Sequence, residues 1–214
     1  MLSCCGSLGV CLTREIGFVN VHISQVFQLP LAIPFWVVFF FAFVRENRVV
    51  LGAMRDPNSE QDRGTFRGLM IGSSIALVAA IAASFAPWLT ISNEPAALWL
   101  GLLLLLAGAV LRRICFKTLG ESFTGTVIVK KEQTIVQHGP YRYVRHPSYT
   151  AAFMMFIGVG LALGSWISVA VLFVIHCIVY GRRVSAEEAA LLQTLGEPYR
   201  LYMLRTKRYI PFVI

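Results

Sequence analysis

The sequence predicts an all-α integral membrane protein with about five transmembrane helices. Of its 214 residues, 57% are hydrophobic and only 14% are charged, and the mean hydropathy is +0.67. A soluble globular chain has about 45–50% apolar and about 25% charged residues, so the composition excludes a mainly soluble or disordered protein. At about 20 residues per span, five spans use about half of the chain, which leaves no room for a large separate soluble domain.

Four apolar blocks provide these spans. The first covers about 21–44, the second about 69–91 and the third about 96–115. The fourth block, 149–180, has 32 residues, which is too long for one span and short for two. Because Gly164 near its middle is typical of a turn, we expect a tight hairpin of two short helices there.

The basic residues orient these spans in the membrane. They concentrate in three segments: Arg45, Arg48, Arg55, Arg63 and Arg67 between the first two spans; Arg112, Arg113, Lys117, Lys130, Lys131, Arg142 and Arg145 after the third; and Arg182, Arg183, Arg200, Arg205, Lys207 and Arg208 after the hairpin. The loop 92–95 and the hairpin tip carry no Lys or Arg. By the positive-inside rule, we expect the basic segments and the C-terminus in the cytoplasm and the N-terminus outside. The net charge of +8 then favours anionic lipid as a partner over nucleic acid.

The cysteines give no framework or metal site. There are five of them, Cys4, Cys5, Cys11, Cys115 and Cys177. An odd number without a CxxC pair predicts neither a disulfide scaffold nor zinc binding, so we expect no bound metal. The apolar run in the first 20 residues is interrupted, and we expect no cleaved signal peptide.

The segment 137–149, QHGPYRYVRHPSY, is the first candidate for chemistry. Pro147 suits the first position of a helix, which makes His146 the expected N-cap residue. The free N–H groups of such a helix end form an anion site, and Arg142 and Arg145 stand beside it. The alternative is an ordinary basic flank whose tyrosines form an interfacial belt.

A second candidate is a polar stripe that continues the last span toward the cytoplasm. His176, Tyr180, Arg183 and Glu187 follow one another at spacings of four, three and four, which places them on one helical face. Polar groups at membrane depth usually face a cavity or the protein interior. The alternatives are a core histidine and a simple Arg183–Glu187 pair. The adjacent Glu188 points about 100° away on the helix, so we expect one of the two glutamates to be merely solvated.

Glycines mark a helix end and a site of close packing. Gly196 is a plausible C-cap of the helix that carries the stripe, and 199–208 then suits an amphipathic interfacial piece. Gly158, Gly160 and Gly164 superficially match a dinucleotide loop, but they lie in an apolar span with no preceding strand. Close helix packing explains them better.

The motifs GPYRYVRHPSY, RRVSAEE and GEPYRLY, in this order around a hairpin, resemble the isoprenylcysteine carboxyl methyltransferase family in its short, five-span, prokaryotic-type form. The resemblance covers 112–214. It implies an all-helical membrane enzyme that binds S-adenosylmethionine without a Rossmann domain, in a pocket at the cytosolic face. The chain then divides into N-terminal helices (1–111, the third helix ending near 115) and a catalytic region (112–214) with a cofactor loop, the hairpin 149–180 and an interfacial C-terminal segment.

The resemblance also assigns individual residues. The family's cofactor contacts fall on Ile135, Val136, Tyr141, His146, Pro147, Ser148, Tyr149 and Glu187. Arg183 matches the position that the family uses toward the substrate, and we add His176, His146 and Tyr180 as candidates for proton removal from an amine or thiol acceptor. The chain departs from the family at Ala186, where an acidic residue is common.

The implied reaction is methyl transfer from a sulfonium to a hydrophobic or lipid-linked acceptor, most simply a carboxylate, by in-line displacement. A carboxylate needs no general base at neutral pH, because its ordinary pKa is far below 7. An amine or thiol acceptor would need one. Three alternatives stay open: a lipid-amine or thiol methyltransferase, an NADPH-dependent reductase similar to membrane sterol reductases, and a non-enzymatic component that binds anionic lipid.

Overall fold

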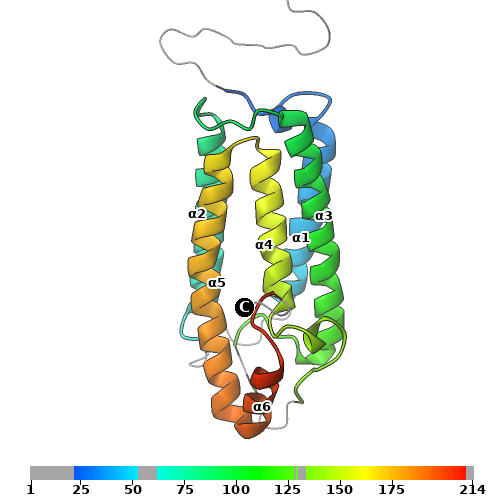
Figure 1. Cartoon of the computed structure of the whole chain (residues 1–214), viewed down its shortest axis with the longest axis vertical. Coiled ribbons are helices and arrows are strands. Elements are labelled where there is room, and N and C mark those ends of the chain that lie inside the picture. Colours follow the sequence, from blue (N-terminus) through cyan, green and yellow to red (C-terminus); the bar gives the residue numbers. More distant parts are fainter. Residues whose placement is uncertain (1–21, 53–61, 128, 130–133, 211–214) are drawn as a thin grey trace, which may run out of the picture.

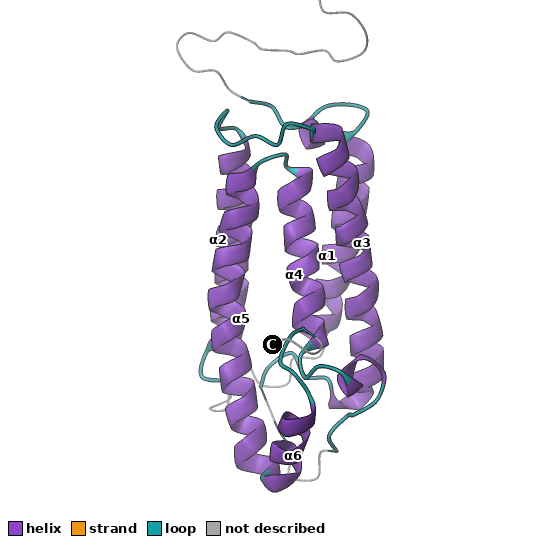
Figure 2. Ribbon diagram, viewed as in Figure 1, coloured by secondary structure: helices purple, strands orange, loops and turns teal. Residues whose placement is uncertain are grey.

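The computed structural model describes residues 22–52, 62–127, 129 and 134–210. The elements in this part of the chain are η1 (Gln25–Phe27), α1 (Ala32–Gly52), α2 (Thr65–Ser84), α3 (Glu94–Leu119), η2 (Gly120–Ser122), η3 (Gly139–Arg142), α4 (Pro147–Ala162), α5 (Trp166–Leu195) and α6 (Glu197–Arg205). Helices α1 to α5 run along the long axis of one bundle, and the short α6 lies at one end (Figure 1). No β-strand occurs in the described residues, and helices dominate the view in Figure 2. The predicted all-α fold is confirmed.

The membrane character is also confirmed. Within the described ranges, α2, α3 and α5 are long and apolar enough to cross a membrane, and α4 is a shorter apolar helix. Helix α1 is apolar at first but carries Arg45, Glu46 and Arg48 toward its end. The number of spans and their orientation stay predictions. The calls on Cys4, Cys5, Cys11, Arg55, Lys130 and Lys131 lie outside the described residues.

The first helix lies further along the chain than the predicted first span. We expected it at about 21–44, whereas α1 covers Ala32–Gly52. Residues 28–31 form a bend and turn before it. The helix continues past the apolar block, and there Oε1 of Glu46 lies 2.5 Å from Nε of Arg112 on α3. The ion pair satisfies both charges, and residues 45–52, which the composition placed in a loop, lie in the helix.

The hairpin is confirmed. Helices α4 and α5 meet at Gly164, whose φ of +69° is a left-handed conformation that favours glycine. The hairpin tip pairs with the loop between α2 and α3: the Ile91 amide donates to the Gly164 carbonyl (2.9 Å), and the Trp166 amide donates to the Leu89 carbonyl (2.9 Å). The two loops that lack basic residues therefore lie together at one end of the bundle, as the charge pattern predicts.

Glycines allow α4 to approach both α3 and α5 closely. A Cβ atom on Gly158 would lie 2.6 Å from the carbonyl oxygen of Gly101, and one on Gly160 would lie 2.8 Å from the Cα atom of Val169. The packing interpretation of this glycine run is confirmed. Helix α3 also continues unbroken across the predicted boundary at 111–112, so the two parts of the chain share one bundle.

Candidate functional site

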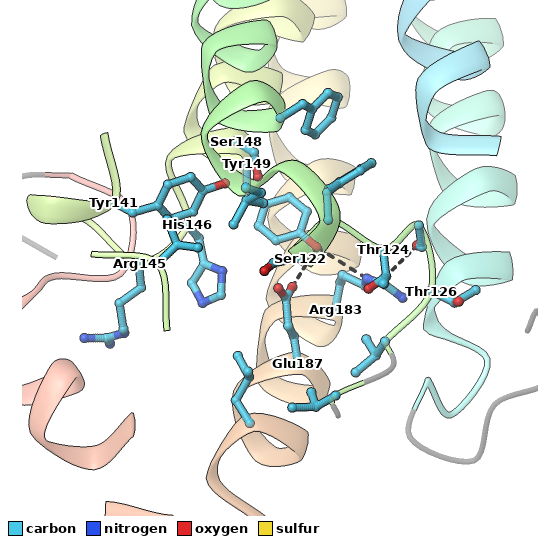
Figure 3. A pocket seen from close by; sticks show the side chains of 18 of the residues that line it. Ser122, Thr124, Thr126, Tyr141, Arg145, His146, Ser148, Tyr149, Arg183 and Glu187 are labelled. Carbon is cyan, nitrogen blue, oxygen red and sulfur yellow. Dashed lines mark hydrogen bonds between the residues drawn. The ribbon is translucent and has the colours of Figure 1, made fainter. Parts of the chain in front are cut away.

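A pocket opens at the end of the bundle opposite the hairpin tip. Side chains from α3, from the connecting residues 122–127, 129 and 134–136, from the first turn of α4, from the C-terminal half of α5 and from α6 line it. Figure 3 shows Tyr149, Arg183 and Glu187 in this pocket. The polar segments on either side of the hairpin therefore meet here, as expected from the sequence.

Arg183 is buried, and four neighbouring groups accept hydrogen bonds from its guanidinium. Its Nη1 forms an ion pair with Asp62 and donates to Oγ1 of Thr65 at 3.0 Å. Its Nη2 donates to the Gly125 carbonyl at 2.8 Å, and its Nε donates to the Tyr149 hydroxyl at 3.3 Å. All three guanidinium nitrogens are engaged, so the group has a fixed orientation in the pocket wall.

Glu187 faces the pocket beside Arg183. The Tyr149 hydroxyl donates to Oε2 of Glu187 at 3.0 Å while it accepts from Arg183. The three side chains form a relay of hydrogen bonds across α4 and α5 (Figure 3). Glu187 remains partly exposed, and its carboxylate can accept further hydrogen bonds from a bound molecule.

Glu188 holds the C-terminal segment against the pocket. This carboxylate is only 4% exposed. It accepts from Nε of Arg145 at 3.0 Å, from Nε2 of His146 at 3.2 Å and from Nη2 of Arg208 at 2.5 Å. The expectation that one glutamate of the pair is merely solvated was wrong, because adjacent positions on α5 face two different polar environments.

The backbone at the start of α4 is as the sequence predicts, but its hydrogen bonding is different. Pro147 is its first residue and His146 its N-cap. However, the amides of Tyr149 and Thr150 donate to the His146 carbonyl, at 3.1 and 3.3 Å. Arg112 also donates to the carbonyl of Ser148 at 2.7 Å. The predicted free anion site is therefore largely satisfied internally, and side chains supply the cations near the pocket instead.

Aromatic rings form the wall toward α6. Tyr141, Tyr199 and Tyr202 all line the pocket, and the Tyr202 hydroxyl donates to the Tyr141 carbonyl at 2.7 Å. Burial raises the pKa of Tyr202 to about 12, so this hydroxyl remains a donor at neutral pH. The bond fixes α6 to the short helix η3.

The pocket contains most of the side chains that the sequence singled out. Those that line it are Ile135, Val136, Tyr141, His146, Ser148, Tyr149, Arg183 and Glu187. Pro147 is buried behind them at the start of α4, where it shapes the helix end.

His176 and Tyr180 are not among the lining residues. His176 is fully buried, stacks on Phe156 with ring centroids 3.6 Å apart, and donates from Nδ1 to the Leu172 carbonyl at 2.7 Å. Tyr180 packs against Tyr149 with centroids 5.0 Å apart. The stripe is continuous on α5, but only its half nearer the C-terminus of that helix reaches the pocket.

Sequence reasoning missed two charged residues of the site. Asp62 pairs with Arg183 across a separation of 121 residues, and no local pattern marks such a partner. Arg112 was counted only as a basic flank, whereas it is buried in α3 and lines the pocket. Its position near the end of a purely apolar run was an available signal, because charges at such depth are usually paired.

The residues present fit S-adenosylmethionine, a ligand with a carboxylate, an amine, ribose hydroxyls and an aromatic base. Arg112 and Arg145 supply cations, Glu187 supplies an acceptor, and tyrosine rings supply flat apolar walls. The buried hydroxyl of Thr126 lines the same pocket and has no hydrogen-bond partner among the described residues. A buried polar group of this kind calls for a ligand or water.

Comparisons with known proteins point to one family. Residues 99–193 match the model of the isoprenylcysteine carboxyl methyltransferase (ICMT) family. The protein-S-isoprenylcysteine O-methyltransferase of Schizosaccharomyces pombe is 33% identical over 108 residues, which are 50% of this chain and 46% of that protein. The protein-S-isoprenylcysteine O-methyltransferase B of Arabidopsis thaliana is 31% identical over 115 residues, which are 53% and 58% of the two chains.

A solved structure agrees with these matches. The eukaryotic intramembrane Ras methyltransferase ICMT superposes with a TM-score of 0.57 and 28% identity, covering 65% of this chain and 52% of that one. The present chain thus spans about half the length of the relatives that it matches. The resemblance drawn from the motifs is confirmed: residues 99–193 are similar in sequence to the isoprenylcysteine carboxyl methyltransferase family, and the bundle is similar in fold to a solved member of it.

Proposed function

We propose that this protein transfers a methyl group from S-adenosylmethionine to the carboxylate of a hydrophobic or lipid-linked acceptor. The observation that carries the proposal is the pocket between α4 and α5, where a fixed guanidinium lies next to a partly exposed carboxylate. This pocket falls largely within the residues that match the methyltransferase family.

The cofactor would be held by the residues that the resemblance assigns and that line the pocket. Glu187 would accept hydrogen bonds from the cofactor, and Tyr141 would pack against its base. Arg112 and Arg145 line the pocket while pairing with Glu46 and Glu188, and they would be the cations that meet its carboxylate. When bound, S-adenosylmethionine supplies an electrophilic methyl group on a sulfonium centre.

The chain's own contribution to the reaction is alignment. In-line displacement mainly requires the nucleophile and the methyl group to be held in alignment, and Arg183 would hold the acceptor carboxylate. His146 is the candidate base that lines the pocket, and its Nε2 donates to Glu188 at 3.2 Å. A base held in this way supports a carboxylate acceptor, which needs no proton removal, over an amine or thiol. His176 and Tyr180 are buried and do not line the pocket. The proposal therefore keeps Arg183 as the reactive-site residue and gives the other two a packing role.

We also propose that the pocket end of the bundle faces the cytoplasm and that the acceptor reaches it from the membrane. Arg142, Arg205 and Lys207 are described residues at this end, and positive charge favours the cytoplasmic side. A lipid-linked acceptor inserts its lipid into the membrane, from which it would enter the pocket.

Calorimetric titration of the detergent-purified protein with S-adenosylhomocysteine, and in parallel with NADPH, tests the class of enzyme. Saturable binding of S-adenosylhomocysteine alone is the expected result. Binding of NADPH alone would make the protein a reductase, and binding of neither to folded protein would favour the non-enzymatic alternative.

Two variants and a substrate assay sharpen this test. Glu187→Gln should weaken S-adenosylhomocysteine at least several-fold, because a charge-assisted hydrogen bond contributes about 1.5–3 kcal/mol. Glu197→Gln removes an exposed carboxylate on α6 and should bind like wild type. Incubation with N-acetyl-S-farnesylcysteine, a lipid-linked carboxylate, should give a base-labile methyl ester, whereas a base-stable product on lipid amines or thiols would identify the other acceptors.

A further inference from the structure

The guanidinium of Arg183 is anchored from the N-terminal part of the chain, outside the residues that match the family. Its ion-pair partner Asp62 precedes α2, and Thr65 at the start of α2 accepts a second hydrogen bond from the same Nη1 atom at 3.0 Å. The side of Arg183 that faces α2 is therefore built by a segment for which the C-terminal motifs give no signal.

Asp62 is itself rigidly placed. The side chain is 1% exposed. Its Oδ2 accepts from the Phe66 amide at 2.9 Å, and its Oδ1 accepts from the Val127 amide at 3.1 Å in addition to the ion pair with Arg183. One carboxylate thus ties the start of α2, the connection after α3 and the middle of α5 together at the pocket wall.

The remaining groups around the guanidinium leave it one orientation. The Gly125 carbonyl accepts from Nη2. The Tyr149 hydroxyl accepts from Nε and donates to Glu187. Asp62 is the charged member of this set that contacts Arg183 directly. Removing its charge would leave the guanidinium with neutral partners alone, and the group could then rotate toward Glu187.

We infer that Asp62 is a positioning residue, which acts through Arg183 to hold the acceptor carboxylate in line with the methyl group. This inference rests on the proposed function, in which Arg183 binds that carboxylate. It extends the site to the N-terminal half of the chain and assigns that half a part in acceptor binding. Asp62 itself touches neither cofactor nor acceptor.

The ion pair between Asp62 and Arg183 also has an opposite interpretation, which predicts the opposite change in the acceptor KM. Asp62 carries the functional group of the acceptor, so it would act as an internal competitor if the acceptor carboxylate had to displace it. Its two backbone hydrogen bonds and its burial argue against displacement. The two interpretations predict changes of the acceptor KM in opposite directions.

The test measures methyl transfer to N-acetyl-S-farnesylcysteine and S-adenosylhomocysteine binding for wild type, Asp62→Asn and Asp62→Glu. Asp62→Asn should raise the acceptor KM about 10- to 100-fold, the factor that the loss of one charge-assisted hydrogen bond gives. The S-adenosylhomocysteine Kd should stay within about twofold, because Asp62 lies on the far side of Arg183 from Glu187. Asp62→Glu keeps the charge and should raise the acceptor KM less. Glu197→Gln, an exposed carboxylate-to-amide change, is the matched control.

Three results would overturn the inference. An acceptor KM that is unchanged in both variants would show that the charge at position 62 does not position Arg183, and a lower KM would favour the competitor interpretation. A loss of cofactor affinity as large as the loss of acceptor affinity would show a merely structural role, since some loss of thermal stability is expected in any case. If Asp62→Asn does not fold, the KM of Asp62→Glu decides in the same way, since the longer side chain must shift the carboxylate. Absence of methylation or binding in wild type would instead overturn the proposed function.

Discussion

Replacement of Glu188 by alanine tests how the C-terminal segment is held onto the pocket. The change leaves Arg145 and His146 without their common carboxylate while both stay buried, with side-chain exposures of 10% and 4%. Removing one partner of a buried ion pair costs about 3–5 kcal/mol. Arg208, 41% exposed, adds little to this because water screens its charge.

The expected loss lies at the lower end of that interval. Nη1 of Arg145 keeps hydrogen bonds to the carbonyls of Met203 and Thr206, so its charge is not left entirely without acceptors. We therefore expect Glu188→Ala to lower the free energy of unfolding by about 3 kcal/mol. For a chain of this size the melting temperature should fall by roughly 6–12 °C.

The assay is thermal unfolding of the purified protein in detergent, with and without S-adenosylhomocysteine. The variant should also bind the ligand more weakly, because Glu188 fixes the segment that carries Tyr199 and Tyr202 against the pocket. Glu197→Gln serves as the control on an exposed carboxylate. A melting temperature and an affinity equal to those of wild type would refute the role assigned to Glu188.

Three other changes test separate features. Gly158→Ala should destabilise the protein by about 1–3 kcal/mol, because its Cβ would lie 2.6 Å from a backbone oxygen of α3, whereas Gly181→Ala, which meets nothing within 4 Å, should melt like wild type; equal melting temperatures would contradict the packing argument. Burial raises the pKa of Asp62, but hydrogen bonds from two amides and the adjacent guanidinium outweigh it and hold this pKa below its ordinary value. The stability that the Asp62 carboxylate contributes is therefore complete above about pH 4 and is lost as the pH falls through the lowered pKa. The difference in melting temperature between wild type and Asp62→Asn should shrink only on acidification below about pH 4. A difference that disappears near neutral pH would count against this. Tyr202→Phe removes the 2.7 Å hydrogen bond to the Tyr141 carbonyl and should cost about 1 kcal/mol in thermal unfolding, an expectation that an unchanged transition would rule out.

The polar stripe on α5 shows how far periodicity can predict a site. The spacings correctly placed His176 and Arg183 on one face of a continuous helix. Seven residues of helix rise by about 10 Å, however, and the pocket reaches only the C-terminal end of the stripe. Periodicity fixes the direction of a side chain around the axis but not the depth at which a cavity ends, so the stripe contained both lining residues and residues packed in the interior.

What the sequence determined by itself is local. Apolar runs predict the helices after the first one, Pro147 and Gly196 mark where two of them begin and end, and Gly164 marks the hairpin, because each of these signals acts on the backbone within a few residues. The short motifs that carry the family resemblance are local in the same sense, which is why the lining residues of α4 and α5 could be named.

What only the tertiary structure decided is the pairing of charges. Asp62 meets Arg183, Glu46 meets Arg112, and Glu188 contacts Arg145, His146 and Arg208 from other segments. A charge buried at the edge of an apolar bundle must be paired or hydrogen-bonded to be stable, so the sequence implies that partners exist. Which residues they are depends on the side-by-side packing of the helices, and that packing brings together positions far apart along the chain.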